Sequence, residues 1–121
     1  MTAERDIQTQ ILLELSRGDV RLFRINAGTA WQGVVVEHTR ERLVLAHPRA
    51  VRLAAPGVSD LIGWAPGGRF AAVEVKTPRG RPTPEQIAFI ELVRRAGGVG
   101  GISRSVEDTV QILRGFDLPL R

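Results

Sequence analysis

A mixed α/β fold in a single domain is what this sequence predicts, and three observations predict it. The chain has 121 residues, a length typical of one domain with one modest hydrophobic core. Its composition, 43% hydrophobic and 25% charged residues, is typical of soluble globular proteins. Helical and strand-like periodicities follow one another in the order α, β strands, α, β, α. We therefore expect one domain over residues 1–121, with a central β-sheet flanked by helices.

The first predicted element is a helix over residues 3–17. Its apolar residues recur at helical spacing and form one stripe: Ile7, Ile11 and Leu15. Glu4 falls on the same stripe, one turn before Ile7. Its carboxylate is therefore expected to point toward whatever the helix packs on. The alternative is a first-turn glutamate that complements the helix dipole.

A strand is predicted next, over residues 20–25, because this stretch is rich in apolar and β-branched side chains. Three further β-like runs, separated by a polar stretch, predict an extra β-hairpin around residues 32–54. This segment is either an insertion or a dimer element.

Two more apolar strands, over residues 59–65 and 70–76, are predicted to form a hairpin because Gly67 and Gly68 separate them. A loop with three prolines follows.

The last elements are expected to be a helix over residues 84–96, a strand over 99–103 and a helix over 106–114. Thr83 is suited to cap the first of these helices, with Gln86 closing a capping box.

Several classes of chemistry are excluded by residues that the chain lacks or spaces wrongly. Without cysteine there is no disulfide, thiol nucleophile or cysteine-ligated zinc site, and without tyrosine there is no tyrosyl–DNA intermediate. His38 and His47 are too far apart for a helical zinc pair. The sequence has no P-loop, so we expect no nucleotide cofactor.

The sequence also predicts where the protein resides. It has no run of roughly 18 apolar residues, the length of a membrane span. Residues 1–6 lack the pattern of a signal peptide. We expect a protein without a membrane partner, in the cytoplasm of a bacterium or of a phage-infected host cell.

The charge balance favours a polyanionic partner. Seventeen lysines and arginines against thirteen acidic residues give a net charge of +4, and the pI is near 11.2. Nucleic acid is the simplest such partner, although an arginine-rich genome would leave the same balance. Lys76 is the single lysine among these cations, and an ammonium group differs from guanidinium because its pKa shifts readily.

Ionisable residues stand out in the second predicted hairpin, which is otherwise apolar: Asp60, Glu74 and Lys76. Glu74 and Lys76 project from the same face of their strand because they are two residues apart. Charges in the middle of a sheet are unfavourable unless they are paired or bind a metal. Two carboxylates held close together therefore indicate a site for a hard divalent cation. The alternative is an exposed Glu–Lys pair that contributes little.

A shared cation site requires one particular register in this hairpin. A two-residue turn would place Asp60 opposite Val75, on the wrong face, whereas a shift of one residue places it opposite Glu74 or Lys76. We therefore predict a three-residue or bulged connection, or a bulge near Gly63.

Taken in order, these motifs resemble the VRR-NUC nucleases, a branch of the PD-(D/E)xK superfamily with the restriction-endonuclease-like fold. The motifs are Gly57-Val58-Ser59-Asp60-Leu61-Ile62-Gly63, Glu74-Val75-Lys76 and Thr83-Pro84-Glu85-Gln86. The resemblance covers most of the chain and is that of a small stand-alone member. One departure is the long segment over residues 32–53.

The resemblance implies a set of site residues. The implied ligands of Mg²⁺ or Mn²⁺ are Asp60, Glu74, the backbone carbonyl of Val75, and Glu4, the last directly or through water. Lys76 would be the catalytic lysine, able to orient or deprotonate the attacking water or to neutralise charge on the phosphate. Gln86 would be an active-site polar residue; the alternative is the capping-box glutamine, and both can hold.

Four arginines are candidates for DNA binding. Arg79 and Arg81 lie in the proline-bounded loop next to Lys76, where they could contact backbone phosphates. Arg24 and Arg104 are further candidates, each with an ordinary surface role as the alternative.

The implied function is that of a Mg²⁺- or Mn²⁺-dependent DNA endonuclease that hydrolyses phosphodiester bonds. Because the chain shows no base-reading motif, selectivity for DNA structure, such as branched DNA or a four-way Holliday junction, is favoured over recognition of a defined sequence. Small stand-alone members resemble junction-cleaving homodimers. The alternatives are a non-catalytic DNA-binding module on the same fold and a nuclease that cuts linear duplex DNA.

Overall fold

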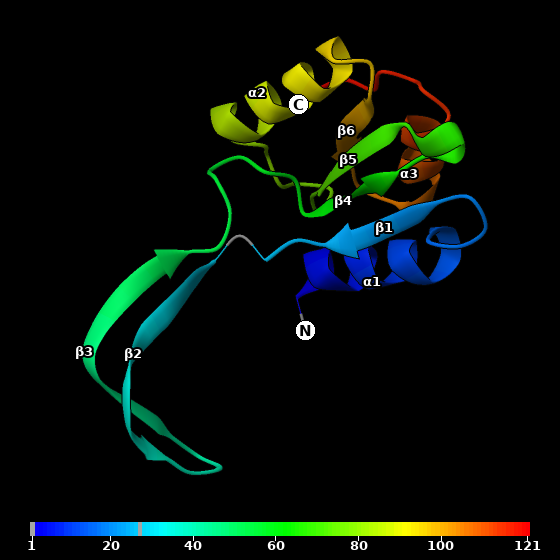
Figure 1. Ribbon diagram of the computed structural model, residues 1–121. Coiled ribbons are helices and arrows are strands. Elements are labelled where there is room, and N and C mark those ends of the chain that lie inside the picture. Colours follow the sequence, from blue (N-terminus) through cyan, green and yellow to red (C-terminus); the bar gives the residue numbers. More distant parts are fainter. Residues whose placement is uncertain (1, 27) are drawn as a thin grey trace. The chain divides into compact units, whose positions relative to one another are not determined.

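The computed structural model describes residues 2–26 and 28–121 (Figure 1). Its helices and strands are α1 (Ala3–Leu15), β1 (Arg21–Arg24), β2 (Thr29–His38), β3 (Leu43–Arg52), β4 (Leu61–Trp64), β5 (Phe70–Val75), α2 (Pro84–Arg95), β6 (Val99–Ser103) and α3 (Val106–Leu113). They divide into two units. Residues up to 25 and from 56 onward form the first, and the residues between them form the second. Whether residues 1–121 act as one domain is not tested by this division, and the single domain stays a prediction.

A four-stranded mixed sheet is the centre of the first unit. Its strand order is β1-β4-β5-β6, with β5 and β6 parallel and the other neighbours antiparallel. The parallel pair requires a crossover, which α2 supplies. Figure 1 shows α1 and α2 on opposite sides of this sheet. The predicted α/β class is confirmed, and the element order is consistent with a restriction-endonuclease-like core.

The hydrophobic core lies between the sheet and the helices α1 and α3. Strand β5 is buried along nearly its whole length, and its residues alternate between the two faces. Ala71, Val73 and Val75 pack in one cluster with Ile11 of α1 and Ile112 of α3. The residues between them, including Glu74, face the side that α2 covers. A carboxylate is thereby placed in a strand that is otherwise apolar.

The ends of the elements lie within three residues of the predicted ends, and the strand over residues 99–103 matches at both ends. Helix α1 ends at Leu15 instead of residue 17 because Ser16 has non-helical backbone angles and caps the helix. The Ser16 side chain bonds to β1 instead. The Ser16 hydroxyl accepts a hydrogen bond from the Leu22 amide (2.9 Å) and donates one to the Leu22 carbonyl (3.2 Å). Among the described residues, no helix has the length and apolarity to cross a membrane.

The second unit is the extra hairpin that the sequence predicts around residues 32–54, with strands that begin earlier, at Thr29. Strands β2 and β3 form a two-stranded antiparallel sheet of their own, with two irregularities in the register. Most of its side chains are exposed to solvent.

Candidate metal centre

The connection between β4 and β5 sets the register of the site. The amide of Ala65 donates to the carbonyl of Arg69 (2.8 Å), which leaves a three-residue loop, Pro66–Gly68. The ladder then runs without a bulge to the first residue of β4. The next residues outward, Asp60 and Glu74, are therefore opposite each other and share a face. The predicted three-residue connection is confirmed, and the alternative bulge near Gly63 is not present.

Three carboxylates converge at this end of the sheet. Glu4 comes from the first turn of α1, Asp60 directly precedes β4, and Glu74 lies in β5. One carboxylate oxygen from each lies within 4.8 Å of those of the other two. Residues at positions 4, 60 and 74 of the chain are thus brought to one point, as the inward stripe of the first helix predicts for Glu4.

The position of Asp60 is set by backbone hydrogen bonds. Its Oδ2 atom accepts a hydrogen bond from the Val75 amide at 2.9 Å. Its own carbonyl accepts one from the Ile25 amide at 2.8 Å. The residue therefore links the ends of β1 and β5, and only part of its carboxylate is left for another partner.

Glu74 is the most unfavourably placed of the three carboxylates. Its side chain is only 1% exposed. Its Oε2 atom accepts a hydrogen bond from Gln86 Nε2 (3.2 Å) and lies 3.9 Å from Lys76 Nζ. Its Oε1 atom is buried and has no hydrogen-bond partner among the described residues. Burial first, and then the neighbouring Asp60, raise the pKa of Glu74 to about 9, although Lys76 opposes this.

Glu4 is held at the site by the packing of its helix. Burial and, next, the charge of Asp60 raise the pKa of Glu4 above its ordinary value, while Lys76 lowers it. One turn later, the Oε1 atom of the buried Gln8 accepts a hydrogen bond from Arg24 Nε at 2.9 Å. Arg24 of β1 therefore fastens α1 to the sheet close to Glu4.

These observations fit a bound divalent cation. It is unfavourable to ionise all three carboxyl groups at this distance without a cation, and one buried oxygen lacks a hydrogen-bond partner among the described residues. A hard cation such as Mg²⁺ or Mn²⁺ prefers oxygen ligands and would relieve both conditions. The Val75 carbonyl, which the resemblance adds to the ligands, belongs to the residue between Glu74 and Lys76; its role stays a prediction.

The carboxylate cluster predicts how stability depends on pH. The Glu74 carboxyl keeps its proton up to about pH 9 in the folded protein but loses it near 4.5 when unfolded. Its contribution to the free energy of unfolding of the metal-free protein therefore falls as the pH rises between these values. Because ligands must be deprotonated to bind metal, we expect Mn²⁺ to raise the Tm more at pH 8 than at pH 5. Calorimetry with Mn²⁺ and with EDTA checks this; an equal rise at both pH values would contradict it.

Gln86 forms the predicted capping box and also contacts Glu74; its active-site role stays a prediction. Its Oε1 atom accepts a hydrogen bond from the Thr83 amide (2.9 Å), and Thr83 Oγ1 accepts one from the Gln86 amide (3.2 Å). This capping box directs the Nε2 donor toward Glu74. The start of α2 is thereby coupled to the carboxylate cluster.

Two substitutions separate these roles. Gln86→Glu keeps the capping box, since glutamate is also a capping-box acceptor, but replaces the donor to Glu74 with a carboxylate. Gln86→Ala removes both. We expect Gln86→Glu to reduce metal-dependent activity about as much as Gln86→Ala, whose loss of the cap should also destabilise the protein by roughly 1 kcal/mol. Full activity of Gln86→Glu would show that the donor is dispensable.

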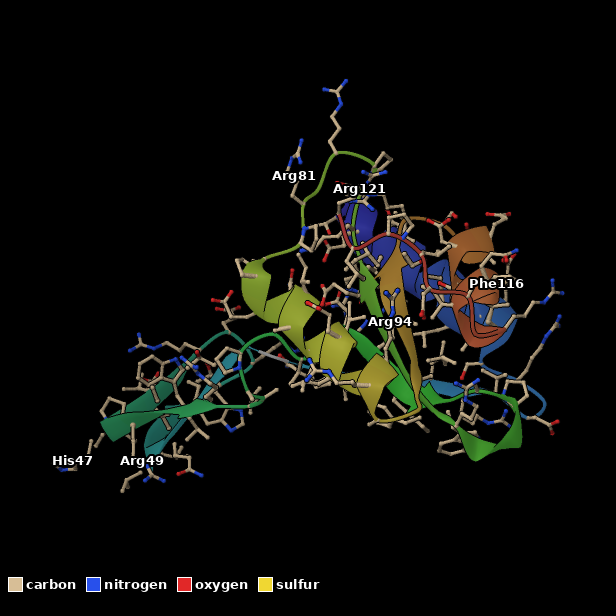
Figure 2. The ribbon with its side chains drawn as sticks, turned by 90° about the horizontal axis from the view of Figure 1, so that it is seen from above. His47, Arg49, Arg81, Arg94, Phe116 and Arg121 are labelled. Carbon is tan, nitrogen blue, oxygen red and sulfur yellow. The ribbon has the colours of Figure 1, made fainter. Side chains whose placement is uncertain are left out.

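The four arginines predicted to bind DNA lie in two kinds of surroundings. Arg24 donates to side chains of α1, and Arg104 donates to two backbone carbonyls of the loop after β5. Arg79 and Arg81 are exposed in that loop. Figure 2 shows the Arg81 side chain extending away from the ribbon. Binding of DNA by all four stays a prediction.

Two features of the site were not anticipated from the sequence. One is the hydrogen bond from the Val75 amide to Asp60, and the other is the clamp formed by Arg24 with Gln8 and Thr9. A polar Gln8 beside an apolar stripe was the signal available for the clamp, but the sequence does not say which residue meets it.

A comparison with protein families gives one match. The model of the VRR-NUC domain matches residues 7–107. The matched stretch contains Asp60, Glu74, Lys76 and Gln86 but begins three residues after Glu4. No curated protein matches the chain.

Proposed function

The chain belongs to the VRR-NUC family of nuclease domains, and from this premise we propose that it is a metal-dependent endonuclease that hydrolyses phosphodiester bonds of DNA. The observation that carries the proposal is the convergence of Glu4, Asp60 and Glu74, with one buried carboxylate oxygen left without a donor. These three side chains would hold Mg²⁺ or Mn²⁺. Residues 1–121 would form one nuclease domain. The protein would act in the cytoplasm.

Each residue of the site has a proposed task. A bound divalent cation supplies positive charge that stabilises the phosphate and the leaving oxygen. Lys76 is 14% exposed, and its Nζ atom lies 3.9 Å from Glu74, so the ammonium group is confined to the site yet reachable by water. It would orient the attacking water or take its proton. Gln86 would keep the Glu74 carboxylate turned toward the site.

The substrate proposal rests on charge. Arg79 and Arg81 lie three and five residues after Lys76 in the chain and are exposed, which suits contacts with DNA phosphates on either side of the cleaved bond. Phosphate contacts carry no sequence information. We therefore propose selectivity for DNA structure, with branched DNA or a four-way junction as the preferred substrate.

The β2–β3 hairpin supports the proposal of a homodimer. A two-stranded sheet is marginally stable by itself, yet this one exposes 61% of Trp31, 64% of Val34 and 65% of Val36. Exposed apolar side chains in such a group mark a surface that associates. A second copy of the chain would cover them and would supply a second site for the second strand.

Cleavage assays with a junction and with linear duplex DNA test the function. We expect the protein to cut the junction with Mg²⁺ or Mn²⁺ and not with EDTA. Lys76→Met retains the side-chain stem but removes the ammonium group, and it should lower the rate by about 10²-fold or more.

The outcomes separate the alternatives. Unchanged cleavage by Lys76→Met would reject the assigned site. Binding without any cleavage by the natural sequence would favour a non-catalytic module. Equal cutting of linear duplex would remove the proposed selectivity.

A further inference from the structure

The loop between β5 and α2 is bonded to Arg104, a residue between β6 and α3. The Gly80 amide donates to the Thr77 carbonyl at 3.0 Å and closes a turn. Arg104, which follows β6, donates from Nε to the Thr77 carbonyl (3.2 Å) and from Nη2 to the Gly80 carbonyl (2.7 Å). One guanidinium group therefore bonds to both ends of the turn that carries Arg79.

A pocket of about 450 Å³ opens beside this loop. Its lining residues are Pro78, Arg79, Gly80, Arg81, Arg104 and Arg121. Figure 2 shows Arg121 near the base of the loop from which Arg81 extends. No acidic side chain lines the pocket, and none of these arginines forms an ion pair with a carboxylate of the described residues. The pocket thus brings together four arginines, none of which is in an ion pair within the described chain.

The position of the pocket relates it to the metal centre. Arg79 is three residues after Lys76, so their Cα atoms are at most about 11 Å apart. Within that range, Arg79 can reach a phosphate that neighbours the one at the metal. Arginine side chains bind phosphate oxygens through parallel N–H donors.

We propose that this pocket binds a backbone phosphate of the DNA strand next to the one being cleaved, and that Arg104 is its positioning residue. Arg79 and Arg81 contact the phosphate. Arg104 acts through them, because two of its donors already bond to loop carbonyls. The role of the pocket rests on the function proposed above. A lysine at position 104 would keep the charge but lacks the planar fork that reaches both carbonyls.

A double-mutant cycle tests the role of Arg104. All variants carry Lys76→Met so that the DNA stays intact, and binding of a labelled four-way junction is measured with Mg²⁺ at several salt concentrations. Arg79→Ala and Arg81→Ala should each weaken binding about tenfold and lower the salt dependence by about one ion. Arg104→Lys should weaken binding to a similar degree although it keeps its charge. In the Arg79→Ala/Arg81→Ala background, Arg104→Lys should have no further effect.

Two further measurements distinguish a released loop from an unfolded protein. Thermal melts establish that each variant is folded. Limited trypsin digestion should cut the bond between Arg79 and Gly80 faster in Arg104→Lys, because the loop is released. The positioning role would be overturned if Arg104→Lys bound the junction as tightly as the Lys76→Met parent. It would also be overturned if Arg104→Lys weakened binding equally with and without Arg79 and Arg81. A parent protein that binds neither junction nor duplex DNA would instead overturn the proposed function together with it.

Discussion

Replacing Glu74 with glutamine is expected to abolish metal-dependent cleavage while making the metal-free protein more stable at pH 8. Glutamine has nearly the same shape, so the β5 strand and the packing of α2 are kept. It cannot supply the anionic oxygen that a divalent cation needs, and the cleavage rate should fall by about 10²–10³-fold. The variant also lacks the buried carboxyl, whose pKa is raised to about 9 and one of whose oxygens has no hydrogen-bond partner among the described residues.

The gain in stability follows from the burial of the Glu74 carboxyl and from the charge of Asp60 beside it. At pH 8 the unfolded chain ionises this carboxyl freely, whereas the folded protein opposes ionisation by burial and by the charge of Asp60. Removing the group should therefore raise the Tm in EDTA by roughly 4 °C or more, and Mn²⁺ should stabilise the variant less than the natural protein. Glu91→Gln, on the exposed face of α2, is the matched control and should change neither cleavage nor Tm. A lower Tm for Glu74→Gln in EDTA would contradict the account of the site.

Among glycine-to-alanine substitutions in this hairpin, Gly63→Ala is expected to lower the free energy of unfolding the most. A Cβ atom at Gly63 would overlap the Arg21 carbonyl oxygen and lie 2.7 Å from its carbonyl carbon and 3.0 Å from the Leu22 Cα atom. These are backbone atoms of the paired strand β1, which cannot move aside without opening the ladder. We expect a loss of about 3 kcal/mol or more in the free energy of unfolding, measured by urea denaturation.

Gly67→Ala provides the control in the same hairpin. Gly67 has a φ of +82° and no atom near its missing Cβ. The substitution should cost only about 1–2 kcal/mol of backbone strain. Because β1 carries Arg24, which fastens α1, Gly63→Ala should also impair cleavage at temperatures where it is still folded. Similar stability of the two variants would show that β1 is not held against β4 as described.

Local sequence patterns were sufficient to predict most of the secondary structure. The start of α2 was predicted at Thr83 with Gln86 closing the capping box, and both hydrogen bonds are present. Such a cap depends on residues three positions apart, so the sequence contains all of its parts. The connection between β4 and β5 was predictable for a related reason: only a three-residue loop or a bulge lets Asp60 share a face with Glu74.

By itself, then, the sequence determined the α/β order and the family, because these depend on near neighbours and on motif spacing. For the hairpin register it left a three-residue connection and a bulge as alternatives. Only the tertiary structure decided which partners distant residues meet. It joined Arg24 to α1, joined Arg104 to a loop more than twenty residues away, and packed β1 against Gly63. An arginine or a glycine has the same local pattern with or without such a partner, so long-range packing alone assigns its role.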